Sequence, residues 1–122
     1  MKLYFSPGAC SLSPHIVLRE AGQPAELEKV DLATHRTASG ADYYGITPKG
    51  QVPLLITDEG DRVSEGPIIC QYVADRAGAT TLMPAAGTPA RAMVEAILAA
   101  VGGDEAPQAD DMTVLVARRR TA

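Results

Sequence analysis

The order of strand and helix patterns between residues 2 and 78 restricts the fold more than any other feature of this sequence. "KLYFS" predicts a strand ended by "PGA", and a helix follows from Ser13 to a stop at Gly22. "ELEKVDL" predicts a second strand, and "HRTASGADYYGITPKGQ" a loop with a short helix. "VPLLITDEGDRVSEG" has the pattern of a β-hairpin. "SEGPIICQYVADRAG" predicts a helix with Ser64 as N-cap and Gly78 as its end.

This order predicts an α/β fold. Two parallel strands joined by a right-handed helical crossover and followed by an antiparallel hairpin give a thioredoxin-like, mixed four-stranded sheet with flanking helices. In the first helix we expect Ile16, Val17 and Ala21 to share one face. In the second helix the residues expected on one face are Ile68, Ile69, Tyr72 and Val73.

Charge and hydropathy exclude several classes of partner. The chain has 122 residues and a formal net charge of −4, so it lacks the basic excess that favours nucleic acid or an anionic membrane surface. It has no apolar run typical of a signal-peptide core or a membrane span, and we expect a cytoplasmic protein. Its two cysteines are expected to be reduced thiols rather than a disulfide.

Cys10 is the first candidate for chemistry, because it lies in a Gly-Pro turn just before a helix. Unpaired N–H groups and the positive end of the helix dipole favour a thiolate there. The alternative is a small buried hydrophobic residue beside a turn. Cys70, within "PIICQYV", is expected in the core. His15 is more consistent with a structural helix residue than with a proton carrier.

Three separated motifs occur in the order found in one family. "MKLYFSPGACSLSPHIVLREAG", "TPKGQVPLL" and "SEGPIICQYVAD" resemble the N-terminal domain of bacterial beta-class glutathione transferases, over about residues 1–85. The resemblance implies glutathione as co-substrate, no metal, and either conjugation to a small electrophile or thiol-disulfide exchange. Cys10 matches the cysteine beside the glutathione sulfur, and Ser11 matches the alternative activating hydroxyl.

The resemblance also implies a binding role for other residues. Val52 and Pro53 match the cis-proline turn that pairs with the cysteinyl backbone of glutathione, and Gln51 flanks it. Glu65 and Gly66 match the helix start that receives the γ-glutamyl group. Pro53 could instead be an ordinary trans proline, and Glu65 merely a favourable first-turn charge. The remaining matches are His35 and Arg36, which stand where family members commonly have a lysine for the glycyl carboxylate.

Position 13 bears on the type of exchange. Ser13 lies where dithiol oxidoreductases of this fold keep a second cysteine, so Cys10 is expected to form a mixed disulfide with glutathione that a second glutathione releases. In conjugation the site would lower the pKa of the glutathione thiol and aim its sulfur at the electrophile.

The composition changes after residue 78. We expect a thioredoxin-like glutathione-binding domain at 1–78, a linker at 79–89 and an atypical helix-loop-strand segment at 90–122, with a helix at 88–101 capped by Thr88 and a strand at 112–117. Residues 92–120 weakly resemble the C-terminal end of PPM-type phosphatases, in which Asp110 would bind metal. One carboxylate does not make a metal site, and phosphatase activity is not expected.

The family continues as an all-helical second domain that supplies most of the electrophile site. We therefore expect weak activity, exposed apolar residues on the two helices that are partly covered by the helix at 88–101, and a homodimer that could exchange its C-terminal segment. The alternative is a non-catalytic binding or interaction module, or a fusion product without turnover.

Overall fold

The computed structural model describes residues 1–101, which form a mixed five-stranded sheet with helices around it. The strands are β1 (Lys2–Phe5), β2 (Glu26–Asp31), β3 (Arg36–Thr37), β4 (Leu54–Ile56) and β5 (Arg62–Ser64). The helices are α1 (Leu12–Glu20), the 3₁₀ helix η1 (Tyr43–Gly45), α2 (Gly66–Ala77) and α3 (Pro89–Val101). The spatial order is β3-β2-β1-β4-β5, with β1 and β2 parallel and the other neighbours antiparallel.

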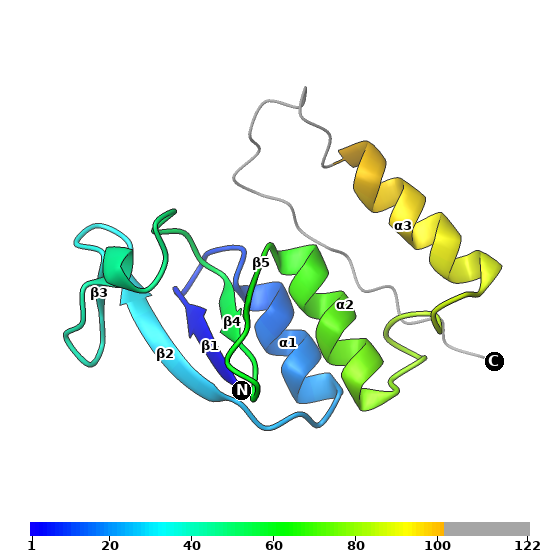
Figure 1. The fold of residues 1–122 in the computed structure, drawn as a ribbon, viewed down its shortest axis with the longest axis horizontal. Helices are drawn as coiled ribbons and strands as arrows, with labels where there is room; N and C mark the ends of the chain where they lie inside the picture. Colours follow the sequence, from blue (N-terminus) through cyan, green and yellow to red (C-terminus); the bar gives the residue numbers. More distant parts are fainter. Residues whose placement is uncertain (102–122) are drawn as a thin grey trace.

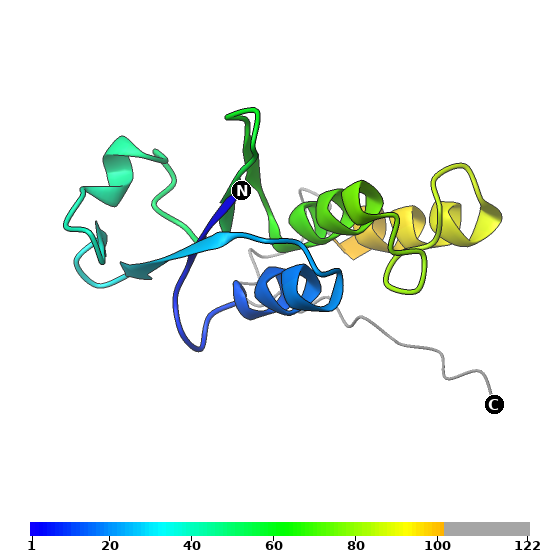
Figure 2. The same ribbon diagram turned by 90° about the horizontal axis from the view of Figure 1, so that it is seen from below.

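The thioredoxin-like architecture is thus confirmed, with one additional edge strand. Figure 1 shows α1 and α2 side by side next to β1 and β4, while η1 and β3 lie at the other end of the sheet. The view at right angles (Figure 2) shows α3 beyond α2, farther from the sheet.

Alternating side chains of the strands divide the core into two clusters. Leu3 and Leu55 are paired across β1 and β4 and pack with the buried side chains of α1 and α2, including Val17 and Ile69. Tyr4 and Leu54, one residue along each strand, belong to the second cluster with Val30, Tyr43 and Val52. The second cluster lies under η1 and the 49–53 loop, and therefore under one side of the candidate site.

The helix faces differ partly from the expectation. Val17 and Ile69 are buried, whereas Ile16 and Ile68, which were expected on the same faces, are 48% and 51% exposed. Helices that pack against both a sheet and each other bury only a narrow stripe, and in α1 Leu18 takes the inward position instead.

The ends of α2 also correct one prediction. Gly78 ends the helix in a left-handed conformation, as predicted. Its N-cap, however, is Glu65 with φ of 70°, not Ser64, which is the last residue of β5. The hairpin therefore continues one residue farther than the cap pattern indicated.

The helix expected at 88–101 is confirmed as α3, and Thr88 Oγ1 accepts a hydrogen bond from the Arg91 amide at 3.2 Å. It was expected to cover the exposed apolar residues of the other helices in part, and Leu12, Ile16 and Ile68 remain about half exposed. None of the described helices is long and apolar enough to cross a membrane. The predicted strand at 112–117 and Asp110 lie outside the described residues.

Candidate functional site

Cys10 lies in the loop between β1 and α1, facing the segment that precedes β4. Its side chain is partly buried, and its Sγ donates a hydrogen bond to the Val52 carbonyl oxygen at 3.3 Å. The Val52–Pro53 peptide bond is cis, as predicted. The thiol and the backbone that flanks the cis-proline thus face each other at hydrogen-bonding distance.

Ser11 is turned into its own loop. Its side chain is buried, and the Oγ accepts a hydrogen bond from the Ser6 amide and donates one to the Ser6 carbonyl, both at 3.1 Å. These two bonds close the loop between β1 and α1 and hold Cys10 at the start of the helix. The hydroxyl is thereby engaged in the loop that presents the thiol.

The start of α2 lies beside the first turn of α1 and the cis-proline. A Cβ placed on Gly66 would lie 3.7 Å from Ser13 Oγ and 3.9 Å from Pro53 Cγ. The first residue of α2, the first turn of α1 and the cis-proline therefore meet at one point. The N–H groups of the first turn of α2 lie at the positive end of the helix dipole, which favours an anion.

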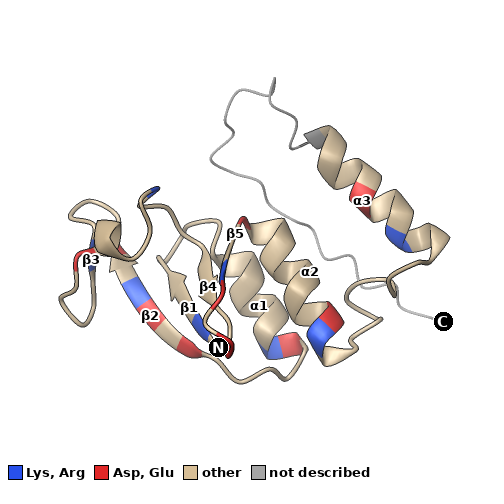
Figure 3. Ribbon diagram, in the orientation of Figure 1, with Lys and Arg blue, Asp and Glu red and all other residues tan. Residues whose placement is uncertain are grey.

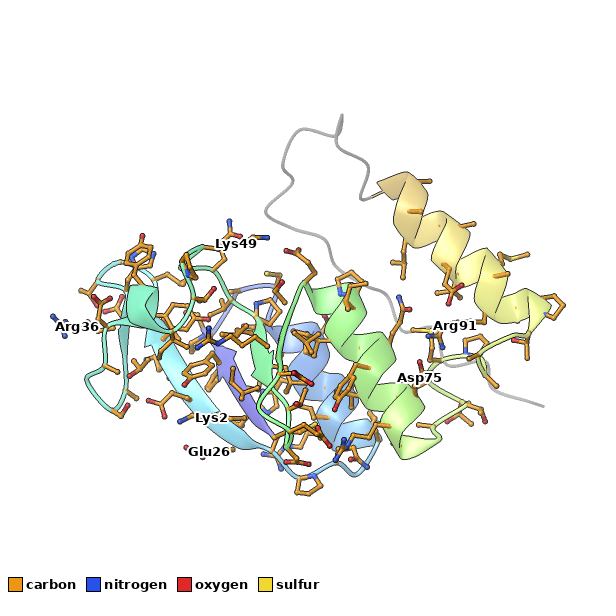
Figure 4. All side chains as sticks on the ribbon, in the orientation of Figure 1. Lys2, Glu26, Arg36, Lys49, Asp75 and Arg91 are labelled. Atoms are coloured by element: carbon orange, nitrogen blue, oxygen red, sulfur yellow. The ribbon has the colours of Figure 1, made fainter. Side chains whose placement is uncertain are left out.

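Glu65 and Lys49 form an ion pair beside this helix start. Lys49 Nζ lies 3.3 Å from Glu65 Oε1, and both side chains are well exposed. Figure 4 labels Lys49 on the loop that leads to β4. Lys49 was not among the residues expected at the site, although it lies within the quoted motif "TPKGQVPLL". Its position four residues before a cis-proline was the available signal.

The two residues expected at the glycyl end are placed differently from each other. The His35 ring stacks on Tyr44 with centroids 4.4 Å apart, and the Tyr44 phenol lies 3.1 Å from His35 Nε2. Arg36 points outward at the edge of the sheet (Figure 4), where its guanidinium donates to the Gly40 carbonyl at 3.1 Å. The structure therefore brings His35 to η1, and it leaves Arg36 in its own hairpin.

Gln51 contributes its backbone to the site. Its side chain is exposed, and its carbonyl oxygen accepts a hydrogen bond from the Tyr43 phenol at 2.9 Å. Tyr43 lies in the region for which the sequence indicated only a loop with a short helix. This contact was not foreseen.

The geometry agrees with a known family. The family described as "Glutathione S-transferase, N-terminal domain" matches residues 8–76, which include every candidate site residue. The chain belongs to this family.

Individual members of the family are similar over the same region. A glutathione S-transferase of Escherichia coli O157:H7 is 52% identical over 75 residues, which are 62% of this chain and 37% of that protein. One of Xanthomonas campestris pv. campestris is 41% identical over 107 residues, which are 88% of this chain and 50% of that protein. The chain thus spans half or less of the length of these curated relatives.

Solved structures of glutathione S-transferases superpose well on the chain. A sphingomonad enzyme complexed with glutathione is 46% identical, with a TM-score of 0.78 over 84% of this chain and 51% of that one. A bacterial beta-class enzyme from Sphingomonas chungbukensis is 44% identical, with the same TM-score and the same shares covered. The expected beta-class likeness is supported, and no comparison supports the phosphatase resemblance.

Two further residues of this glutathione S-transferase domain behave as the sequence predicted. Cys70 is buried, and burial raises the pKa of its thiol to about 11, which makes it unreactive near neutral pH. The His15 ring packs against Phe5, with centroids 5.8 Å apart. Among the described residues, no group of three or more His, Cys, Asp or Glu side chains could hold a metal ion.

A surface depression of about 390 Å³ lies away from this site. It is lined by residues at the start of β1 and β2 together with Asp58 and Arg76. Cys10 follows the opposite end of β1, so the depression is not part of the candidate site.

Proposed function

We propose that this domain binds glutathione and holds the glutathione sulfur beside Cys10. The observation that carries the proposal is the Cys10 Sγ facing the Val52 carbonyl at 3.3 Å, next to the start of α2. The peptide N–H of the cysteinyl residue of glutathione would take the place of the thiol as donor to this carbonyl, in the manner of an added strand. Two of the similar solved structures, the sphingomonad enzyme and a Sulfitobacter homologue, are complexes with glutathione.

The start of α2 suits the γ-glutamyl end of glutathione, which carries one carboxylate and one ammonium group. The N–H groups in the first turn would receive the carboxylate. The Glu65 carboxylate would receive the ammonium group, replacing its contact with Lys49. Since both side chains of this ion pair are exposed, exchanging partners costs little.

The glycyl end would be held less firmly. Of the two expected residues, only His35 lies against η1, because Arg36 is engaged at the edge of β3. A neutral imidazole offers one N–H donor, whereas the lysine common in the family offers a full charge. We therefore propose a weaker affinity for glutathione than in members with that lysine.

The chemistry follows from a thiolate held at this place. In conjugation, the glutathione thiolate attacks an electrophile and displaces its leaving group. In exchange, the Cys10 thiolate attacks the glutathione sulfur of a mixed disulfide between glutathione and another thiol, takes up the glutathione as an adduct on Cys10 and releases the other thiolate. A second glutathione thiolate then attacks the glutathione sulfur of this adduct, which restores the Cys10 thiolate and releases glutathione disulfide, because position 13 is a serine and offers no second thiol.

We propose that this chain conjugates electrophiles weakly, and that its disulfide exchange activity is reduced less than its conjugation activity. The electrophile would approach over the exposed side chains of Leu12 and Ile68, which lie on the first turns of α1 and α2. The described residues supply this one apolar wall. Exchange requires only the glutathione part of a mixed disulfide and a second glutathione, and both would use the same peptide site.

Calorimetric titration with glutathione tests the binding proposal. We expect saturable binding, and in Glu65→Ala a dissociation constant raised about tenfold, the equivalent of one charged hydrogen bond. The matched control is Glu59→Ala, which removes an exposed carboxylate paired with Arg76 in the β4–β5 turn. Equal affinity in both variants, or no binding by the unaltered chain, would contradict the proposal.

Mass spectrometry after incubation with glutathione disulfide tests the role of Cys10. We expect a single glutathione adduct, which Cys10→Ala abolishes and Cys70→Ala leaves unchanged. An adduct on Cys70 in the folded protein would argue against a specific site. Glutathione binding without any adduct would favour the non-catalytic binding module.

A further inference from the structure

The 3₁₀ helix η1 connects the two segments that border the proposed ligand from opposite ends. The Tyr43 amide donates a hydrogen bond to the His35 carbonyl at 2.8 Å. The Tyr43 phenol donates to the Gln51 carbonyl at 2.9 Å, directly before the cis Val52–Pro53 bond. A single residue thus joins the segment at His35 to the segment at Val52.

Tyr43 is fully buried in the second core cluster. Its ring packs against Tyr4 with centroids 5.4 Å apart, and Val52 belongs to the same cluster. Burial raises the pKa of the Tyr43 phenol well above its ordinary value, so the group stays protonated and acts as the donor. The fixed ring therefore determines where the Gln51 carbonyl can lie.

Tyr44 adds a second contact between the same segments. Its ring stacks on His35, and a Cβ on Gly50 would lie only 2.5 Å from Tyr44 Cε1 and 2.9 Å from His35 Cδ2. The absence of a side chain at Gly50 lets this backbone pass close under the ring pair. Both tyrosines of "DYYG" therefore contact the 49–53 loop, one from the core and one from the surface.

We propose that Tyr43 is a positioning residue, which sets the place of the Val52 backbone relative to His35 and so controls the affinity for glutathione without touching it. The inference rests on the proposed function, because Val52 is the expected partner of the cysteinyl backbone. Gln51 and Val52 are adjacent, so a displacement of the Gln51 carbonyl displaces the groups that would pair with the peptide.

Tyr43→Phe tests this inference, because it keeps the buried ring and removes only the phenol oxygen. The matched control is Tyr4→Phe, which makes the same change in the other ring of the pair and leaves the Tyr43–Gln51 hydrogen bond in place. By calorimetry we expect Tyr43→Phe to raise the dissociation constant for glutathione about fivefold, the equivalent of one net hydrogen bond. Tyr4→Phe should leave it unchanged.

Backbone ¹⁵N relaxation of the ligand-free variants provides a readout that does not depend on glutathione. We expect greater mobility of the Gln51 and Val52 amides in Tyr43→Phe, with the amides of β2 unaffected. A purely structural role would lower stability and leave the affinity of the folded protein unaltered. Unchanged affinity, or unchanged mobility of these amides, would overturn the inference. If the unaltered chain fails to bind glutathione, the proposed function fails and the relaxation experiment still decides whether Tyr43 holds this segment.

Discussion

Gly50 is the single residue whose identity the site geometry restricts most. Its φ of 63° lies in the left-handed region, and a Cβ there would collide with the Tyr44 and His35 rings. Gly22 has the same φ of 63°, but a Cβ on Gly22 would meet nothing within 4 Å. Alanine substitutions at Gly50 and at Gly22 therefore separate the cost of backbone strain from the cost of the collision with the rings.

We predict that Gly50→Ala lowers the free energy of unfolding more than Gly22→Ala does. The backbone strain shared by both variants costs about 1–2 kcal/mol. Gly50→Ala must in addition displace the exposed Tyr44 ring from His35, which forfeits roughly 0.5–1.5 kcal/mol of ring contact. Urea denaturation of both variants measures the difference. Equal losses would show that the ring pair moves aside without cost.

The contact between α3 and α2 depends on one buried guanidinium. Arg91 is 5% exposed, and its side chain donates two hydrogen bonds to the Asp75 carboxylate, at 2.7 and 2.8 Å. Three further acceptors are Glu95 Oε1, the Pro84 carbonyl and Gln71 Oε1. Figure 3 shows that α1 and α2 carry charged residues at their C-terminal ends only, and Asp75 belongs to this group. Figure 4 shows Arg91 and Asp75 pointing toward one another.

We predict that Arg91→Gln lowers the free energy of unfolding by about 2 kcal/mol, because it removes the charged hydrogen bonds that the buried Arg91 guanidinium donates to Asp75 and Glu95. The control is Arg76→Gln, which should cost less than about 1 kcal/mol, since the ion pairs of Arg76 with Asp58 and Glu59 are exposed. Urea denaturation followed by circular dichroism measures both. Equal losses would mean that α3 is not held by Arg91.

The same contact predicts a dependence on pH. The hydrogen bonds from Arg91 hold the pKa of the Asp75 carboxyl below its ordinary value. The folded state therefore binds this proton less readily than the unfolded state, and the contact stabilises the fold above the unfolded pKa of about 3.9. The difference in stability between the unaltered chain and Arg91→Gln should narrow as the pH falls below about 4. A constant difference through this range would contradict the assignment to Asp75.

At the level of elements, the sequence predicted most of the pieces within residues 1–101 whose signal is local, with the N-cap of α2 as an exception. Strands, helix stops at glycine and the Thr88 cap depend on near neighbours, and the structure has them. The β3 strand was missed because two residues are too few to show an alternating pattern. Its hairpin is held by a residue distant in the sequence, since the Glu28 carboxylate accepts a hydrogen bond from the Ser39 amide at 2.9 Å. This hydrogen bond and the nearby Lys2 lower the pKa of Glu28 to about 2. The division of Ile68 and Ile69 between surface and core was not predicted either, because adjacent residues on a helix are about 100° apart and the packing partner decides which of them is buried.

The residues of the candidate site likewise divide into those that a local pattern predicted and those that it did not. Cys10, Val52 and Glu65 lie in motifs with a strong local pattern, and the structure brings their segments together. Arg36 was expected with His35 at the glycyl end because of its sequence position, yet the direction of its side chain depends on the β3 hairpin, which no pattern revealed. Lys49 and Tyr43 were missed because each acts through a residue elsewhere along the chain, Glu65 for the one and Gln51 for the other.

Within the described residues 1–101, apolar side chains are exposed on the surface of the helices. Leu12 and Ile16 on α1 and Ile68 on α2 are about half exposed, and the two helices carry no charge between their ends (Figure 3). Met93 and Ile97 on α3 are 67% and 57% exposed. Water-exposed apolar side chains gathered on adjacent helices favour association, because burying apolar surface is worth about 25 cal/mol per Å².

We predict that the chain forms a homodimer through the helical face. Sedimentation velocity over a range of concentrations should show a dimer for the unaltered chain and a shift toward monomer for the double variant Ile16→Ser and Ile68→Ser. The control is Leu32→Ser, which removes another exposed apolar side chain from the loop after β2 and should leave the dimer unchanged. A monomer at every concentration would refute the prediction, and a dimer insensitive to the double variant would place the interface elsewhere. Since Leu12 and Ile68 also border the proposed electrophile approach, dimerisation through this face should compete with binding of an apolar electrophile.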